Sequence, residues 1–306
     1  MILPRIAVLM PVYNEEQTIV KTLKTIINQS IPPTLILIGD NESTDRTAFI
    51  AKKFLNTLGF KNYKVIKVNR YPELGKLNIK IVYSVLIKIL KKYYHDEIDY
   101  IATVEADTYL ESTYFEKVIQ HFKEDSKLCI AGGVLEPLGL LQDPYPLMIP
   151  NTGLWGTGRL YKARCLFKIS KIIDTIYLPS WDTDHVILAY ILGHHVSQIP
   201  EAKAYTTRTP REYRGLPKAI RDSGHNLPLW WVLYKAVKKI DLEYLIHYVV
   251  IKVRLIIHFR YRRNRKPLKY VNDIYRNAIN KLFITITVKF VVKWFRVISK
   301  NISKIL

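Results

Sequence analysis

An alternation of short apolar segments with helix-like segments constrains the fold of this chain more than any other feature. Within the first 104 residues, segments with apolar residues at helical spacing separate four apolar segments of strand length. The expected strands are residues 6–12, 35–38, 63–68 and 100–104, and the expected helices are residues 16–28, 46–58 and 78–94. This pattern predicts an α/β fold with a mainly parallel central sheet and helices on both faces.

Polar residues follow each of these predicted strands. They are Tyr13, Asn14 and Glu15 after the first strand, Asp40, Asn41 and Glu42 after the second, Gly75 and Lys76 soon after the third, and Glu105 and Asp107 after the fourth. Ligands of such sheets bind outside the carboxyl ends of the strands, so we expect these side chains to meet at one cleft. The sequence has no G-x-G-x-x-G after the first strand and no G-x-x-x-x-G-K-[ST], which disfavours dinucleotide-redox and P-loop enzymes.

Length and composition indicate a folded chain with one sizeable domain and an appendage. The chain has 306 residues, of which 49% are hydrophobic and 24% are charged, so it can bury a large core. Two cysteines, Cys129 and Cys165, are too few for a disulfide framework and lack metal-ligand spacing, which favours a reducing compartment. The apolar run at residues 6–10 is short and lacks the form of a signal peptide, so we expect a cytoplasmic protein.

Five short motifs occur in a fixed order along the first part of the chain. They are PVYNEE (11–16), NQS (28–30), DNESTDRT (40–47), GKLN (75–78) and EAD (105–107). In this order and spacing they resemble the inverting glycosyltransferases of family 2, which have the Rossmann-like GT-A fold. The later segments GTGRLYKA (156–163) and WDTDHVILAYILGHH (181–195) resemble the acceptor side of that family. The resemblance covers about residues 5–210 and implies a GT-A catalytic domain, which we place at residues 1–226. We expect residues 227–306 to form a basic, mostly helical extension.

The resemblance assigns the two acids after the fourth strand to a metal and the donor diphosphate. A departing diphosphate gains negative charge, which a cation stabilises, and carboxylates are suitable ligands for Mn²⁺ or Mg²⁺. By resemblance Asp107 would ligate the metal, Glu105 would face the ribose or a metal-bound water, and Ala106 would line the same site. The family usually has Asp where Glu105 stands, so the longer side chain would alter the metal distance or weaken direct ligation. Apart from the resemblance, the pair would also fit solvated acids at a strand end.

The resemblance assigns the residues after the first two strands to the nucleoside. Asp40 and Asn41 match the positions that recognise the base, and the Asp40 carboxylate can accept from a base N–H such as the imide of uracil. A local turn before the following helix is the alternative role of Asp40, and both roles can hold. Lys76 would bring an ammonium group to the phosphate or ribose. The other residues that would shape the nucleoside pocket are Pro11, Tyr13 and Glu15.

The general base is expected on the acceptor side. The acidic pair of the family matches Trp181 and Asp182, so Asp182 would deprotonate the acceptor hydroxyl. The first acid of the pair is missing here, Asp184 is the alternative base, and Trp181 would pack against the sugar or acceptor. A cluster of helix-capping residues before an apolar helix at 186–192 is the structural alternative. The remaining residues implied near the entering group are Trp155, Gly156 and Gly158.

The last quarter of the chain is strongly basic. Residues 235–306 contain 18 lysines and arginines against three acids, so about +15 of the net charge of +21 lies there. Charged residues interrupt every long apolar run, which disfavours a spanning helix. If residues 288–306 are helical, five basic residues share one side and Trp294 and Phe295 lie elsewhere, a pattern typical of interfacial helices. We therefore expect region 227–306 to bind an anionic membrane surface, with packing on the catalytic domain or on a partner subunit as the alternative.

These features together predict a peripheral membrane enzyme on the cytosolic face. It would be a Mn²⁺- or Mg²⁺-dependent inverting glycosyltransferase that uses a UDP-sugar or, as second choice, a GDP-sugar, with a lipid-linked or glycan acceptor at the membrane. A nucleic-acid partner is disfavoured, because the basic run RYRRNRK (260–266) lies in no recognisable nucleic-acid-binding fold. The alternative is a non-catalytic basic binding protein on a degenerate GT-A scaffold. Glu105 and Trp181, which stand where the family usually has acids of the site, would then be signs of lost catalysis.

Overall fold

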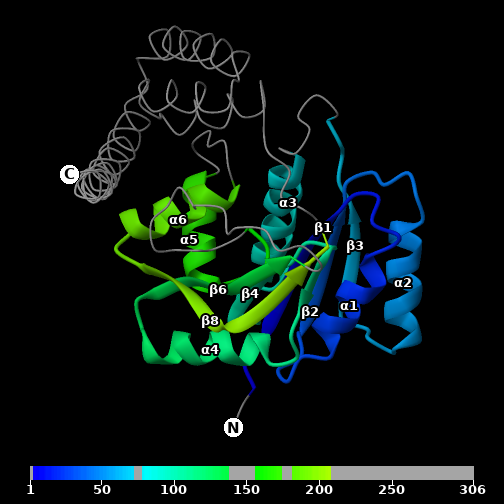
Figure 1. Cartoon of the computed structure of the whole chain (residues 1–306). Coiled ribbons are helices and arrows are strands. Elements are labelled where there is room, and N and C mark those ends of the chain that lie inside the picture. Colours follow the sequence, from blue (N-terminus) through cyan, green and yellow to red (C-terminus); the bar gives the residue numbers. More distant parts are fainter. Residues whose placement is uncertain (1–2, 72–77, 138–155, 174–180, 208–306) are drawn as a thin grey trace, which may run out of the picture. The chain divides into compact units, whose positions relative to one another are not determined.

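The computed structural model describes residues 3–71, 78–137, 156–173 and 181–207, which form an eight-stranded sheet with helices on both faces (Figure 1). The strand order is β3-β2-β1-β4-β7-β6-β8-β5. The strands are β1 (Ile6–Val12), β2 (Leu35–Asp40), β3 (Tyr63–Lys67), β4 (Tyr100–Thr103), β5 (Thr108–Leu110), β6 (Leu128–Pro137), β7 (Arg159–Lys162) and β8 (His195–Thr206). The helices are α1 (Ile19–Ile27), α2 (Thr47–Thr57), α3 (Asn78–Tyr93), α4 (Tyr114–Glu124), α5 (Ala163–Ile173) and α6 (Trp181–Ile191).

The first four strands in the predicted α/β pattern are confirmed. They pair in parallel in the order β3-β2-β1-β4, and the three predicted helices between them are α1, α2 and α3. All seven residues of β1 are buried, as expected of a strand with neighbours on both sides and helices on both faces. The carboxyl ends of these strands therefore lie along one edge of the sheet.

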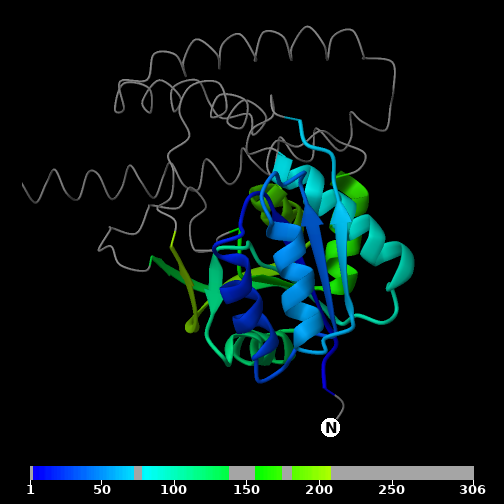
Figure 2. The ribbon, with the colours of Figure 1, turned by 90° about the vertical axis from the view of Figure 1, so that its right-hand side faces the viewer.

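Two helical layers cover the sheet (Figures 1 and 2). Helices α1, α2 and α4 pack on one face, where Ile6, Val8 and Met10 of β1 join a buried cluster with apolar residues of these helices. The alternate residues of β1 point to the opposite face, because successive side chains of a strand alternate. Helices α3, α5 and α6 form the layer on that face. A Cβ on Gly39 of β2 would lie 2.3 Å from Val82 Cγ1, so this glycine lets α3 pack closely.

The second half of the sheet is mixed, which corrects the expectation of a mainly parallel sheet. Strand β7 is antiparallel to β4 and β6, β8 is parallel to β6, and β5 is antiparallel to β8. The chain turns sharply between β4 and β5, and the Thr108 N–H donates to the Glu105 carbonyl oxygen over 3.1 Å. So short a turn cannot make the crossover that a parallel neighbour would need, so β5 pairs at the far edge instead.

Strands β6 and β8 form two ladders separated by an irregularity at Gly133. A Cβ on Gly133 would lie 2.0 Å from the carbonyl oxygen of Ala202, so only glycine allows the two backbones to approach this closely. Pairing resumes after Gly133 and continues until Pro137 lies opposite Thr206. The end of β8 is thereby placed beside β5, where Thr206 pairs with Thr108.

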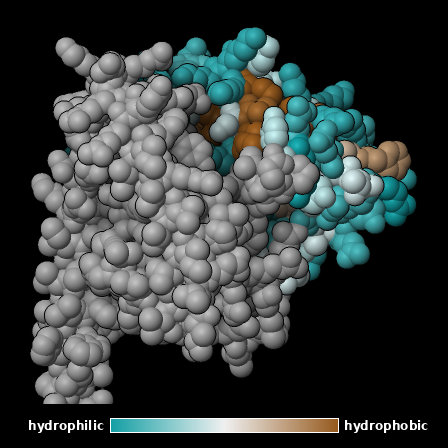
Figure 3. Space-filling view, turned by 90° about the horizontal axis from the view of Figure 1, so that it is seen from above, coloured by the Kyte–Doolittle hydropathy of each residue, from teal (hydrophilic) through white to brown (hydrophobic). Residues whose placement is uncertain are grey.

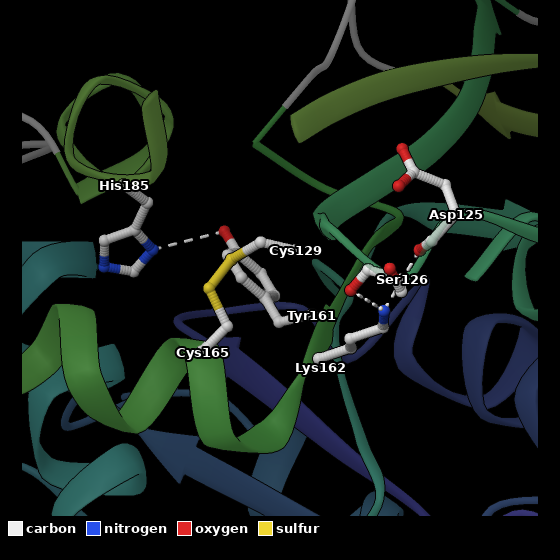
Figure 4. Close-up of a disulfide and its surroundings, with 7 residues drawn as sticks. All are labelled: Asp125, Ser126, Cys129, Tyr161, Lys162, Cys165 and His185. Atoms are coloured by element: carbon white, nitrogen blue, oxygen red, sulfur yellow. Dashed lines mark hydrogen bonds between the residues drawn. A yellow bond between two sulfur atoms is a disulfide. The ribbon is translucent and has the colours of Figure 1, made fainter. Parts of the chain in front are cut away.

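The two cysteines form a disulfide between the sheet and a helix (Figure 4). Cys129 lies on β6 and Cys165 on α5, with their Cα atoms 5.9 Å apart. The sequence alone favoured a reducing compartment, since one pair of cysteines separated by 36 positions makes no framework. The fold brings the two residues together, and the bond ties α5 to the sheet.

Several sequence-based expectations lie outside the described residues. They include the domain boundary between residues 226 and 227, the basic extension 227–306, Lys76 and Trp155. Among the helices that the structure describes, none combines the length and the apolar character needed to cross a membrane.

Candidate active site

The polar segments after β1 and β2 interlock at the carboxyl edge of the sheet. The Asn14 N–H donates to Ser43 Oγ at 3.0 Å, and Asn14 Oδ1 accepts from the Thr44 N–H at 2.8 Å. The Glu15 N–H donates to Thr47 Oγ1 at 2.7 Å. In Figure 3, which views the molecule from above, the visible described residues are mostly hydrophilic and surround a hydrophobic patch. The predicted meeting of these two strand ends is therefore present.

Tyr13 and Arg70 form an aromatic and cationic platform beside this edge. The guanidinium carbon of Arg70 lies 3.6 Å from the centroid of the Tyr13 ring, a cation–π distance. Arg70 Nη1 also donates to Asn41 Oδ1 at 3.3 Å. Tyr13 is 37% exposed, so the platform is open to solvent. The sequence prediction included Tyr13 and Asn41 but missed Arg70, whose position just after β3 was the available signal.

Asp40 and Asn41 have local structural roles. Asp40 is half-buried and its Oδ1 accepts from the Ser43 N–H at 3.0 Å, which confirms the predicted turn. Asn41 is buried, and its side-chain amide donates to the carbonyl oxygens of Val68 and Asn69 at 3.2 and 3.1 Å. Asn41 therefore ties the end of β2 to the chain after β3. Contact of either residue with a base stays a prediction.

Glu15 and Pro11 support the same edge from below. Glu15 is buried, and its Oε2 accepts from Thr18 Oγ1 at 2.8 Å, so it orders the entry into α1. Pro11 is a buried residue of β1 opposite Gly39 of β2.

Glu42, at φ 57°, takes the left-handed conformation, and its carboxylate accepts from the Arg70 N–H at 3.1 Å. That hydrogen bond lowers the pKa of Glu42.

Three threonine hydroxyls hold the segment that contains Glu105, Ala106 and Asp107. Thr22 Oγ1 of α1 donates to the Ala106 carbonyl oxygen at 2.6 Å, and Thr157 Oγ1 accepts from the Glu105 N–H at 2.9 Å. The third hydroxyl belongs to Thr206 at the end of β8, which hydrogen-bonds the Asp107 side chain. The segment is thus anchored from a helix, a loop and a strand.

Asp107 is buried, whereas Glu105 is half-buried. The alternative of two solvated acids is therefore wrong for Asp107. Burial raises the pKa of the Asp107 carboxyl, and the hydrogen bond from Thr206 opposes that rise. A carboxylate in such a place is stabilised by a neighbouring cation.

The donor set of this segment fits a magnesium- or manganese-type ion. The described residues contain no group of three or more His, Cys, Asp or Glu side chains able to hold a metal. An ion of this kind usually takes one or two carboxylates from the protein and its remaining ligands from water and substrate phosphates. Asp107, with Glu105 two residues before it, matches that limited protein contribution.

The glycines of the acceptor-side segment lie beside the end of β4. The Gly158 N–H donates to the Thr103 carbonyl oxygen at 2.8 Å, and Gly156 accepts from Thr103 Oγ1 at 3.2 Å. Gly158 has φ 73°, and a Cβ there would lie 2.8 Å from the hydroxyl oxygen of buried Tyr114. The Tyr114 hydroxyl donates to the Gly158 carbonyl oxygen and accepts from the Gly133 N–H, each at 2.6 Å. Tyr114, which the sequence did not single out, thus sets the course of this segment.

Helix α6 carries both candidate bases in its first turn. The helix begins at Trp181, so these acids are helical residues and not a capping cluster before an apolar helix at 186–192. Asp182 is half-buried, whereas Asp184 is fully buried. The charge of Asp184 acts on Lys80 of α3: burial lowers the pKa of Lys80, and Asp184 opposes that lowering. The geometry therefore favours Asp182 as the acid that can reach a ligand.

Residues 7–79 match the family model of glycosyl transferase family 2. None of the curated proteins compared with the chain matches it. The chain is similar to S. aureus TarS 1–349 in complex with UDP-GlcNAc, with 19% identity, a TM-score of 0.52 and coverage of 91% of this chain and 80% of that one. It is also similar to the mannosyltransferase PcManGT from Pyrobaculum calidifontis in complex with GDP-Man and Mn²⁺, with 12% identity, a TM-score of 0.54 and coverage of 93% and 87%.

The chain covers a smaller part of two other TarS structures. The chain spans 37% of the TarS chain in one structure and 65% of the TarS 1–349 chain in a UDP complex. At identities of 12% to 19%, the likeness to the structures with TM-scores of 0.51 to 0.54 shows the fold. The predicted GT-A type of α/β fold is therefore confirmed for the described residues.

Proposed function

We propose that this chain is a glycosyltransferase of family 2, whose family model matches residues 7–79, and that it transfers a sugar with inversion from a nucleotide sugar to a membrane-borne acceptor. The observation that carries the proposal is that one short segment bonds both predicted sides of the site: the Glu105 N–H donates to Thr157 Oγ1 at 2.9 Å, and Arg159 Nη1 donates to the Asp182 carbonyl oxygen at 2.6 Å. The pKa of buried Tyr83 is raised well above its usual value by burial first, and also by the charges of Glu105 and Asp182. The charges of Glu105 and Asp182 thus both act on Tyr83.

The donor half of the site is the edge formed by the ends of β1 and β2. The Tyr13 ring and the Arg70 guanidinium offer a flat surface to a nucleobase, and the half-buried Asp40 carboxylate can accept from a base N–H. A UDP-sugar is the first choice and a GDP-sugar the second. Structures of similar fold support both choices: TarS 1–349 was solved with UDP-GlcNAc, and PcManGT was solved with GDP-Man.

Asp107, assisted by Glu105, would hold a Mn²⁺ or Mg²⁺ ion. When bound, the ion neutralises negative charge on the departing diphosphate. The threonine hydroxyls of Thr22, Thr157 and Thr206 keep the segment in place. The raised pKa of Asp107 means that protons compete with the ion for the carboxylate as the pH falls.

Asp182 acts as the general base. Its carboxylate accepts the proton of the acceptor hydroxyl while the oxygen attacks the anomeric carbon from the side opposite the departing diphosphate, which inverts the configuration. An acceptor phosphate, which is already ionised, would need no such base. The acceptor is a lipid-linked or glycan molecule at the cytosolic face of a membrane, to which the basic region 227–306 attaches the enzyme.

Nucleotide binding by the whole chain tests the proposal most directly. We expect UDP or GDP to raise the unfolding temperature in the presence of Mn²⁺, with a smaller shift when EDTA replaces the metal. A ligand at a hundred times its dissociation constant stabilises by about 2.7 kcal/mol, which amounts to several degrees. Slow hydrolysis of the matching nucleotide sugar should accompany the shift.

The other outcome favours the rival function. If no nucleotide shifts the unfolding temperature with or without metal, while the protein still binds anionic liposomes, the chain is a basic binding protein on a degenerate scaffold.

A further inference from the structure

Arg159 is a buried cation in the middle of the sheet. It begins β7 and lies between Thr103 of β4 and Gly132 of β6 in the ladder registers. Its side chain is only 3% exposed. The next residue, Leu160, belongs to the core under α1 and α4, so the side chains of Arg159 and Tyr161 point to the opposite face. That face carries α3, α5 and α6.

Arg159 reaches the first turn of α6. Its Nη1 donates to the backbone carbonyl oxygen of Asp182 at 2.6 Å. The guanidinium also hydrogen-bonds the Tyr161 hydroxyl. A guanidinium has several donors in one rigid plane, so it can hold two acceptors in a fixed relation. The backbone of Asp182 is thus attached to β7 at one point.

Tyr161 supplies a second attachment one turn further along α6. Its hydroxyl oxygen lies 3.2 Å from Nδ1 of His185, and the two rings meet edge to face (Figure 4). Burial, followed by the charge of Arg159, lowers the pKa of His185 to about 3. His185 is therefore neutral near pH 7 and serves as a hydrogen-bond partner of the hydroxyl. Residues 182 and 185 of α6 are both held by neighbouring side chains of β7.

The charge of Arg159 is placed among the acids of the site. The guanidinium opposes the rise in the pKa of Tyr83 that Glu105 and Asp182 promote. A buried guanidinium is stable only where carboxylates and acceptors compensate for its lost hydration. The charges of Glu105, Arg159 and Asp182 thus all act on Tyr83.

We infer that Arg159 is a positioning residue that holds the Asp182 carboxylate toward the acceptor by clamping the first turn of α6. The inference rests on the proposed function, in which Asp182 is the general base. Arg159 itself contacts neither substrate nor metal in this scheme. A displacement of about 1 Å at a reacting group can cost on the order of 10²-fold in rate, so loss of the clamp should lower kcat.

Four variants of the full chain test the clamp in steady-state kinetics with a nucleotide sugar. Arg159→Met should lower kcat about 10²-fold and leave the dissociation constant of UDP or GDP within about twofold of the wild-type value. Arg159→Lys, which keeps the charge but has a single donor nitrogen, should recover part of that loss. Tyr161→Phe should lower kcat less, because only the second attachment is removed. Lys162→Met is the matched control on the same strand: its ammonium bonds the Asp125 and Ser126 carbonyl oxygens, away from α6, and kcat should not change (Figure 4).

A double-variant cycle separates positioning from general loss of structure. If Arg159 acts through the Asp182 carboxylate, Arg159→Met combined with Asp182→Asn should be no slower than Asp182→Asn alone. Multiplied effects in the double variant, or wild-type kcat in Arg159→Met, would overturn the inference. If Arg159→Met does not fold, wild-type kcat in both Arg159→Lys and Tyr161→Phe would overturn it instead. The wild type and Asp182→Asn are measured first. Absence of turnover in the wild type, or an unchanged kcat in Asp182→Asn, would defeat the proposed function before the Arg159 and Tyr161 variants are compared.

Discussion

Thr22 of α1 donates its hydroxyl hydrogen to the carbonyl oxygen of Ala106 at 2.6 Å, across 84 positions of sequence. Both groups are buried. The bond joins α1 to the segment that carries Asp107, so this helix helps to shape the candidate metal site.

Thr22→Val should therefore loosen this segment. Valine has the shape of threonine but no donor, so the Ala106 carbonyl loses this partner, which costs about 1–3 kcal/mol in the free energy of unfolding. Urea unfolding checks the stability, and calorimetric titration of Mn²⁺ with UDP or GDP should show weaker binding. Thr57→Val is the control, because its hydroxyl donates to the Lys53 carbonyl oxygen at an exposed helix end. Equal effects in the two variants would contradict a special role for Thr22.

Asp107→Asn should abolish metal-dependent nucleotide binding and yet stabilise the metal-free protein at neutral pH. Burial raises the folded pKa of Asp107, so between the unfolded and folded pKa values the folded state binds more protons than the unfolded state. Stability from this carboxyl is therefore lost as pH rises through that window, and the neutral amide avoids the loss. Unfolding temperatures of the wild type and the variant, at pH 4 and pH 7.5 in EDTA, measure this difference in stability. A lower unfolding temperature of the variant at pH 7.5 would count against the burial argument.

The two acids of α6 should respond differently to amide substitution. Asp182→Asn should lower kcat by about 10²- to 10⁴-fold with donor affinity nearly kept, because a base is lost from a half-buried position. Asp184→Asn should instead lower the unfolding temperature more, because Asp184 is fully buried and its charge acts on Lys80. Measurements of kcat and of the unfolding temperature of both variants show which acid is the general base. If Asp184→Asn loses far more kcat at unchanged stability, Asp184 is the base.

Removal of the disulfide should destabilise the protein without removing the site. Cys129 and Cys165 close a loop of 36 positions, and a crosslink of this span contributes roughly 2–4 kcal/mol. A strong reductant should shift urea unfolding of the wild type to lower concentration. The Cys129→Ala, Cys165→Ala double variant should unfold at lower urea and not respond to reductant. An equal response of both proteins would mean that the reductant acts elsewhere.

Removal of residues 282–306 should release the enzyme from anionic liposomes. If residues 288–306 are helical, five lysines and arginines share one side, each contributing about 1 kcal/mol at an anionic surface, and Trp294 and Phe295 add apolar contact. Turnover of a soluble acceptor analogue should persist, whereas turnover of a lipid-embedded acceptor should fall. Full sedimentation of the truncated protein with liposomes would place the attachment elsewhere. Retention of nucleic acid in place of liposomes would refute the membrane proposal.

Local sequence patterns determined the first half of the fold. The expected strand at residues 63–68 and helix at residues 78–94 match β3 and α3 to within a residue at each end. Such elements follow from the spacing of apolar residues, which the chain carries within each segment. The placement of Tyr13, Asp40 and Asp107 at strand ends followed in the same way, because parallel strands in one sheet end at one edge.

Only the tertiary structure decided the other half of the sheet and the contacts of the site. Strand β5 has three residues and β7 has four, too few for a periodic signal, so their antiparallel pairing depends on distant neighbours. The hydrogen bond from Arg159 to Asp182, the hydrogen bond between Thr206 and Asp107, and the disulfide of Cys129 and Cys165 likewise join separate elements. A residue type shows what a side chain can bond, but the partner is set by packing of the whole core, which no single segment encodes.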